Sequence, residues 1–211
     1  MIPGPSEYYK CPHCGQISMR GSLISGNTFG AELFSDGKRI APMLPEFPSI
    51  VKCKNCKMFY WLNEKNKVPE LNFPNKTENV NIKADEAEFL SIDEYQEIID
   101  SKFNENEDEH KYFRMRLWWA FNDKLRENNN EDFSESENKL FEFNCLKLID
   151  ILNKDDINEK IMIAELYRNI GNFIESKKIL DTIKKDDYNW IKIILENECL
   201  KENKKVILLR Q

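Results

Sequence analysis

The stretch Cys11-Pro12-His13-Cys14 and its counterpart Cys53-Lys54-Asn55-Cys56 decide how the N-terminal part of this chain folds. A spacing of two residues places both thiols of a pair on one tight turn, so that the two sulfurs face one point. Two such turns together supply four thiolates in a tetrahedral arrangement. The 38 residues between the pairs can fold as two hairpins and bring both turns together. The sequence therefore predicts a metal site formed by Cys11, Cys14, Cys53 and Cys56.

The four-thiolate set favours zinc in a structural role. Catalytic zinc keeps an open coordination position for water, and four thiolates leave none. Iron in similar paired knuckles is the alternative metal. A thioredoxin-like redox pair would need a single Cys-x-x-Cys at the start of a helix after a strand, and neither pair fits that pattern. We expect His13, between two ligands, to be solvated.

Composition and charge point to a polar globular protein. The chain has 211 residues, 32% of them charged, and a net charge of −6. Residues 1–80 carry a net charge of +3 and residues 81–211 a net charge of −9. No apolar run approaches the length of a membrane span, and the N-terminus lacks the features of a signal peptide. Because four of the six cysteines form short pairs typical of metal ligands, we expect a cytoplasmic protein.

Residues 1–66 have the features of a small β module. Ser25-Gly26-Asn27 and Ser35-Asp36-Gly37 are hairpin signals between short apolar stretches. Met58–Leu62 leads out of the second cysteine pair as a strand. A module of this size has too little core to fold alone, so a metal would stabilise it. We expect loss of zinc to unfold residues 1–66 and to leave most of the helical structure in place.

The two knuckles resemble those of a zinc ribbon, with CPHCG at 11–15 and CKNCK at 53–57. The resemblance covers the N-terminal third of the chain and implies that the four cysteines are zinc ligands. The long insert between the knuckles departs from the shortest ribbons.

The rest of the chain is predicted to be a linker at 67–90 and a helical domain at 91–211. Helix signals include the capping box Ser91–Glu94 and a long helix over about 108–127. Ser134–Glu137 and Asp156 are predicted to open two further helices, and Asp186-Asp187 to cap the last one. The tail at 206–209 could extend the last helix or pair as a strand. The predicted fold class is therefore α+β, with a β module followed by an all-α domain.

One helical hairpin, at about 156–185, resembles a tetratricopeptide repeat. Ala164 stands at a small-residue position, Tyr167 at the aromatic position and Gly171 in the turn. Ser176 replaces the usual alanine, and the flanking helices do not repeat the pattern. The pairing of such a helical body with a zinc ribbon resembles the architecture of uncharacterised bacterial proteins, and this likeness implies no reaction.

An aromatic helix supplies the candidate partner-binding residues. Trp118 and Trp119 diverge by ~100° around a helix, so one is expected in the core and the other against the zinc module or a partner. A wide buried helix face is the alternative. Asn122, Asp123 and Arg126 could form a polar site nearby. With Tyr167, the residues Trp118, Trp119 and Asn122 are the predicted partner-binding set.

Two functional classes follow, and a third is weaker. No glycine-rich phosphate loop, G-x-S-x-G elbow or H-E-x-x-H motif is present in the sequence, so we expect a non-enzymatic protein. Helical arrays bind peptides or other proteins, which predicts an interaction or adaptor protein with structural zinc. The alternative is a nucleic-acid-binding protein that acts through Lys52, Lys54, Lys57 and Trp61. The weaker option is an enzyme with a cleft between the modules.

Overall fold

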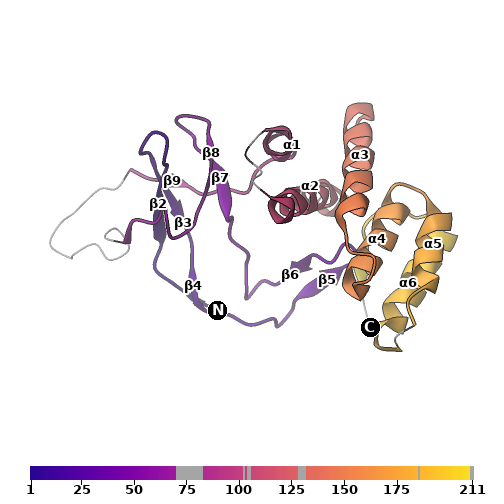
Figure 1. Ribbon diagram of the computed structural model, residues 1–211. Helices are drawn as coiled ribbons and strands as arrows, with labels where there is room; N and C mark the ends of the chain where they lie inside the picture. Colours follow the sequence, from indigo (N-terminus) through magenta and orange to yellow (C-terminus); the bar gives the residue numbers. More distant parts are fainter. Residues whose placement is uncertain (70–82, 102, 104–105, 128–131, 185, 210–211) are drawn as a thin grey trace. The chain divides into compact units, whose positions relative to one another are not determined.

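The computed structural model describes residues 1–69, 83–101, 103, 106–127, 132–184 and 186–209. The chain divides into two compact units, and Figure 1 labels most of their helices and strands. The first unit comprises Met1–Ala31 and Ala41–Glu94, and the second comprises Glu32–Ile40 and Tyr95–Gln211. The chain thus has the predicted mixed α and β character.

The first unit consists of short strands in small sheets. Strands β1 (Ile2–Pro3) and β4 (Leu23–Ser25) form an antiparallel pair, as do β7 (Ile50–Lys52) and β8 (Phe59–Trp61). The third sheet has the order β2-β3-β9, where β2 is Glu7–Lys10, β3 is Ile17–Arg20 and β9 is Asp85–Glu86. Strand β9 runs parallel to β3, a pairing that the sequence did not reveal.

The predicted linker at 67–90 falls largely outside the described residues, which stop at 69 and resume at 83. Its described ends belong to the first unit. Lys67 forms a bridge with Tyr9, and the Val68 amide donates to the Tyr8 carbonyl at 2.8 Å. At the other end Ala87 donates to the Met19 carbonyl at 2.8 Å. These ends therefore add backbone pairing on both sides of the β2-β3 hairpin.

Residues between the two cysteine pairs contribute a hairpin to the second unit. Strands β5 (Glu32–Phe34) and β6 (Arg39–Ile40) are joined by the predicted turn, in which Gly37 has a φ of +76°. The C-terminal tail forms β10 (Leu208–Leu209), which pairs antiparallel with β5. Of the two conformations open to the tail, the structure has the strand.

Three of the helices begin at residues that the sequence predicts, whereas Asp186 and Asp187, predicted to cap the last helix, lie in a 3-10 turn before it. The helices are α1 (Ile92–Asp100), α2 (Glu107–Glu127), α3 (Glu135–Ile151), α4 (Ile157–Asn169), α5 (Phe173–Asp181) and α6 (Asn189–Leu200), with a short 3-10 turn at Asp186–Tyr188. Ser91 and Ser134 form complete capping boxes with the glutamates three residues later. Asp156 caps α4. Local sequence thus sets where α1, α3 and α4 start.

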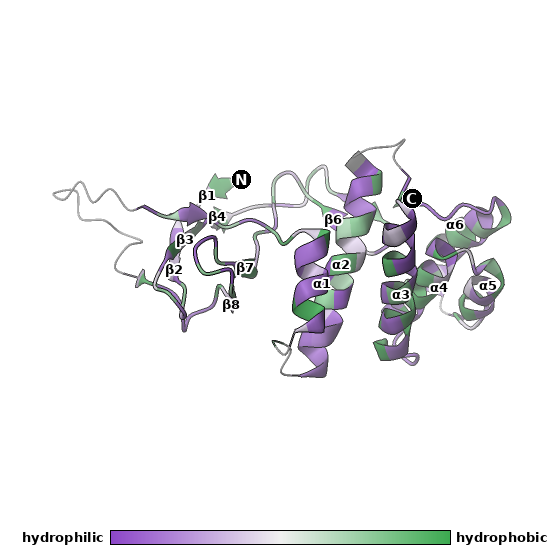
Figure 2. Cartoon of the chain, turned by 90° about the horizontal axis from the view of Figure 1, so that it is seen from above, coloured by the Kyte–Doolittle hydropathy of each residue, from purple (hydrophilic) through white to green (hydrophobic). Residues whose placement is uncertain are grey.

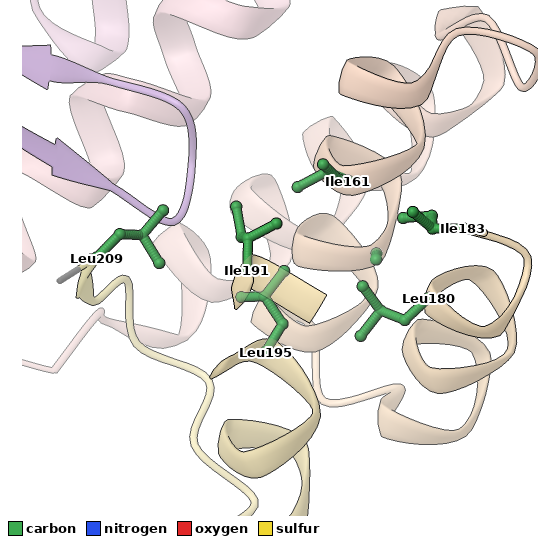
Figure 3. Close-up of a cluster of buried hydrophobic side chains, with 7 residues drawn as sticks. Ile161, Leu180, Ile183, Ile191, Leu195 and Leu209 are labelled. Atoms are coloured by element: carbon green, nitrogen blue, oxygen red, sulfur yellow. The ribbon is translucent and has the colours of Figure 1, made fainter. Parts of the chain in front are cut away.

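The apolar core of the second unit joins helices to the tail strand. Ile161 and Ala164 of α4, Leu180 of α5, Ile191 and Leu195 of α6, together with Ile183 and Leu209, form one buried cluster. Figure 3 shows Ile191, Leu195 and Leu180 directed toward one another, with Leu209 approaching from the C-terminal segment. Leu209 is 8% exposed, so strand β10 contributes to this core.

A buried polar network lies beside this core. Glu165 and Arg168 are both fully buried and form an ion pair of 2.5 Å on α4. The Ser35 hydroxyl donates to Glu165 at 2.6 Å, and Asn169 accepts a hydrogen bond from the Trp118 indole at 2.9 Å. Buried charges are tolerated only when they are paired and hydrogen-bonded, and these partners meet that requirement.

The start of α3 carries a carboxylate whose ionisation stabilises the second unit. Hydrogen bonds from the Lys124 side chain and from Ser134 lower the pKa of Glu137 from 4.5 to about 2. The folded-state pKa lies below the unfolded value, so this stabilisation is present above pH ~4.5 and is lost as the pH falls toward 2. We expect Glu137→Gln to reduce the loss of thermal stability over that interval.

The measurement is the midpoint of the helical circular-dichroism transition at several pH values. Glu135→Gln is the matched control, because that carboxylate is 85% exposed and its ion pair is with the exposed Lys139. A wild-type curve parallel to that of Glu137→Gln between pH 5 and 2 would contradict the prediction.

Candidate metal centre

The two cysteine pairs have the same backbone arrangement. Strand β2 leads into Cys11, and strand β7 leads into Cys53. The Cys11 carbonyl accepts from the amide of Gly15 at 2.9 Å, and the Cys11 amide donates to the Gln16 carbonyl at 2.8 Å. In the second turn the Cys53 carbonyl accepts from Lys57 at 2.9 Å, and the Cys53 amide donates to Met58 at 2.9 Å. Each turn is thus a closed knuckle between two antiparallel segments.

Each knuckle needs a left-handed residue directly after its second cysteine. Gly15 fills this position in the first knuckle with a φ of +80°, and Lys57 fills it in the second with a φ of +63°. Glycine adopts this conformation freely, whereas a residue with a Cβ is strained in it. The second knuckle keeps the strained conformation because the same two backbone hydrogen bonds require it.

The four sulfurs form a compact group. Their Sγ atoms all lie within 4.8 Å of one another. The Cys11–Cys56 distance is 3.7 Å and the Cys14–Cys53 distance is 3.6 Å, so each close contact joins different knuckles. Sulfurs around a tetrahedral zinc with Zn–S bonds of ~2.3 Å are ~3.8 Å apart, so the donor set fits that ion. All six cysteines are free thiols. Cys11, Cys14, Cys53 and Cys56 could therefore hold a metal ion.

Burial differs strongly among the four thiols. Cys11 and Cys53 are each 1% exposed, Cys56 is half-buried and Cys14 is exposed. Burial raises the pKa of Cys11 to about 12 and also raises the pKa of Cys53. A hydrogen bond from the Asn55 side chain lowers the pKa of Cys14 to about 6. A divalent cation would favour the thiolate at every position, so binding it would release protons from the two buried thiols.

A small core supports the site from within the first unit. The buried members are Tyr9, Val51, Tyr60 and Leu62 together with the two buried cysteines. The Tyr60 hydroxyl donates to Ser18 at 2.7 Å, which joins β8 to β3. At the edge of this core, Glu7 pairs with Arg20 at 2.6 Å and with Lys67 at 2.8 Å. Burial raises the pKa of Glu7, but hydrogen bonds from Lys67 and Arg20 outweigh it and bring that pKa to about 2.

His13 is exposed, as its position between two ligands predicts. Among the described residues, the group with metal-binding geometry consists of the four cysteines, without this imidazole. A metal ion held by this group would therefore have sulfur ligands, without the His13 imidazole.

The residues predicted to bind nucleic acid lie around the second knuckle, and the three lysines among them make contacts within the chain. Lys54 pairs with Glu88 at 2.8 Å, and the Lys57 ammonium donates to the Lys54 carbonyl at 2.8 Å. Lys52 lies over the ring of Phe59 at 5.3 Å, and Trp61 is half-buried on β8. The first unit contains nine Lys/Arg and ten Asp/Glu, a net charge of −1. The expected basic character of residues 1–80 is therefore not a property of the folded unit.

The predicted partner-binding residues differ in how far they are buried within the second unit. Trp118 is fully buried, and Asn122 is 1% exposed. Trp119 is half-buried and donates from its indole to the Asp36 carbonyl at 3.0 Å, and Tyr167 is half-buried on α4. Trp118 and Asn122 therefore cannot contact a partner while the second unit is folded, whereas Trp119 and Tyr167 are partly accessible.

The polar residues at the end of α2 bind the chain's own hairpin. Asn122 donates to the Asp36 carboxylate at 2.9 Å, and Arg126 forms an ion pair with the same carboxylate. Asp123 pairs with Lys38 at 2.5 Å. Asp36 is fully buried in this group. The sequence identified Ser35-Asp36-Gly37 as a turn but carried no signal that Asp36 anchors that turn.

The comparisons with known proteins supply no family. No protein-family model matches this chain, and neither a curated protein nor a solved structure matches it significantly. Within the described part of the chain, none of the helices has the length and apolar character needed to cross a membrane.

Proposed function

We propose that this protein is a non-catalytic adaptor whose first unit is a zinc-ribbon-like module with structural zinc and whose second unit, with a TPR-like hairpin, binds a protein partner. The closed thiolate set supports the first part. Four sulfur ligands leave no coordination position for water or substrate, so the ion would hold the fold together without taking part in a reaction.

The observation that carries the second part is an apolar cavity in the second unit. Its volume is about 360 Å³, within the range of ligand-binding pockets. Its walls come from β5, α4, the start of α6 and β10, and they include the side chains of Leu33, Phe34, Ile161, Met162, Tyr188, Trp190, Ile191 and Leu209. An apolar side chain of a partner fits these walls best.

Exposed apolar side chains lie on the helices of the same unit. Ile174 on α5 is 70% exposed, and Ile193 and Leu200 on α6 are 52% and 69% exposed. Figure 2 shows hydrophobic colour on the ribbons of α5 and α6. These residues widen the apolar surface available to a protein and are consistent with an interaction role.

Nucleic acid binding through Lys52, Lys54, Lys57 and Trp61 remains the alternative. The net charge of −1 for the first unit and the Lys54–Glu88 ion pair do not favour it. Nuclease treatment distinguishes this alternative from binding of a protein.

The test is a tagged pull-down from the native host, with and without nuclease, using the wild type and two variants. Met162→Glu places a carboxylate in the cavity wall, whereas Leu146→Glu changes an exposed residue of α3 that does not line the cavity. We expect a defined protein that survives nuclease, is retained by Leu146→Glu, and is reduced about tenfold or more with Met162→Glu.

Two outcomes would overturn the proposal. Loss of all co-purifying molecules after nuclease would transfer the function to nucleic acid binding. Equal recovery by wild type and Met162→Glu, with the helical spectrum intact, would exclude the cavity as the binding site.

A further inference from the structure

The C-terminal segment, residues 203–209, is held by groups that recognise its backbone. Arg168 donates to the carbonyl oxygens of Asn203 and Lys205, the latter at 2.9 Å, and Asn169 donates to the carbonyl of Lys204 at 2.8 Å. Arg168 and Asn169 are 0% and 4% exposed. Arg168 and Asn169 thus form a clamp that binds the extended main chain of the segment. This binding does not depend on the side chains that the segment carries.

Strand pairing continues this recognition toward the end of the chain. The Ser35 amide donates to the Ile207 carbonyl at 2.9 Å, and the Ser35 hydroxyl accepts from the Ile207 amide at 3.0 Å. Leu208 then lies opposite Phe34, and Leu209 lies opposite Leu33. Every one of these contacts could be made equally well by the same segment of a second copy of the chain.

The turn that directs the segment onto its own unit is strained. Helix α6 ends with hydrogen bonds from Glu202 to the Cys199 carbonyl at 3.2 Å and from Asn203 to Glu198 at 3.0 Å. This motif requires a left-handed residue, and Glu202 fills the position with a φ of +53°. Helix α4 ends in a comparable motif, where Gly171 takes the left-handed position with a φ of +83°. Of these two motifs, the one at the end of α6 therefore has the energetic cost of a residue with a Cβ in the left-handed conformation.

The local sequence favours continuation of the helix through this turn. Residues 201–205 are Lys-Glu-Asn-Lys-Lys and contain neither glycine nor proline. Lysine and glutamate are good helix formers, so α6 can continue through Glu202 when the tail is not held by its own unit. The strain at Glu202 disappears in that helical conformation.

We propose that two copies of the chain exchange their C-terminal segments. In the exchanged dimer α6 runs on through Glu202, and the β10 strand of each copy adds to β5 of the other. The Arg168 and Asn169 clamp and the burial of Leu209 are then restored between chains. Exchange conserves the native contacts, relieves the strained turn in both copies, and is favoured by high protein concentration.

The test mixes two variants that each carry one added cysteine, Phe34→Cys and Leu208→Cys. These positions are opposite each other in the β5-β10 ladder, so a disulfide between the variants forms only when the tail of one copy lies on β5 of the other. The mixture is incubated at high concentration and oxidised mildly, and covalent heterodimer is measured on a non-reducing gel. A mixture of Phe34→Cys with Leu200→Cys is the control, because Leu200 is 69% exposed and precedes the turn.

We expect heterodimer that increases with protein concentration and exceeds the control. Adding Glu202→Gly to both variants removes the strain and should reduce the heterodimer several-fold, whereas Glu202→Ala keeps the strain and should not. The double variant Phe34→Cys/Leu208→Cys reports whether the pair can form a disulfide at all. An internal disulfide in that variant with no heterodimer in the mixture at any concentration overturns the proposal. Equal heterodimer yields with Glu202→Gly and Glu202→Ala would also overturn it.

Discussion

Replacement of Cys53 by serine is expected to abolish tight zinc binding and to unfold the first unit, while the β5-β6 hairpin stays folded. Cys53 is 1% exposed and comes directly after β7. The strands of this unit have two to four residues each, and its buried cluster is small. Structural zinc sites contribute about 10–16 kcal/mol of apparent binding free energy, far more than such a core can replace.

The hairpin should behave differently because its contacts lie in the second unit. Asp36 is bound by Asn122 and Arg126, and Ser35 is bound to Glu165 and to the tail. Metal loss removes none of these contacts. Residues 32–40 should therefore stay folded when the metal is lost. The sequence alone predicted that all of residues 1–66 would unfold.

Hydrogen exchange followed by mass spectrometry distinguishes these regions. We expect Cys53→Ser to remove protection from β7 and β8 and to leave residues 33–39 protected. His13→Ala is the matched control, since that imidazole is exposed and should leave both zinc content and protection unchanged. Protection of β7 and β8 that survives loss of the metal would contradict the structural role assigned to zinc.

Replacement of Arg168 by methionine is expected to lower the free energy of unfolding of the second unit by about 3–5 kcal/mol, because it leaves a buried carboxylate without its partner. The guanidinium bonds Glu165 at 2.5 Å and also binds the carbonyls of Asn203 and Lys205. The tail and the hairpin therefore lose an anchor in the same substitution.

Urea unfolding followed by helical circular dichroism measures this effect. Lys178→Met is the control, because its ion pair with Glu175 is exposed and should contribute no more than about 1 kcal/mol. The double variant Glu165→Gln/Arg168→Met removes the stranded charge and should recover part of the loss. A cost for Arg168→Met no larger than that for Lys178→Met would show that the buried pair does not anchor the tail.

Local signals in the sequence predicted the parts of the fold that local chemistry determines. The two Cys-x-x-Cys turns came together as expected, and Ser91, Ser134 and Asp156 begin helices where their capping patterns indicate. In each case a few neighbouring residues satisfy the same hydrogen bonds that define the element. The spacing of donors and acceptors along the chain is then sufficient information.

Long-range pairing could not be predicted in the same way. The bond between Ser35 and Ile207 joins residues 172 positions apart, and strands of two or three residues carry too short a pattern to specify their partners. The same limit applies to charge. Residues 1–80 are basic as a segment, but Lys38 and Arg39 belong to the second unit and the acidic residues at 85–94 belong to the first. Which charges share a surface depends on that pairing.

Zinc K-edge X-ray absorption of the purified protein tests the central claim most directly. The account predicts one zinc per chain with four sulfur ligands at ~2.3 Å and no nitrogen or oxygen ligand. A first shell that contains nitrogen or oxygen would contradict it, because the metal would then keep a position that the four cysteines do not fill. Absence of a zinc edge, with four sulfur ligands found at the iron K-edge, would retain the site and refute the identity of its metal.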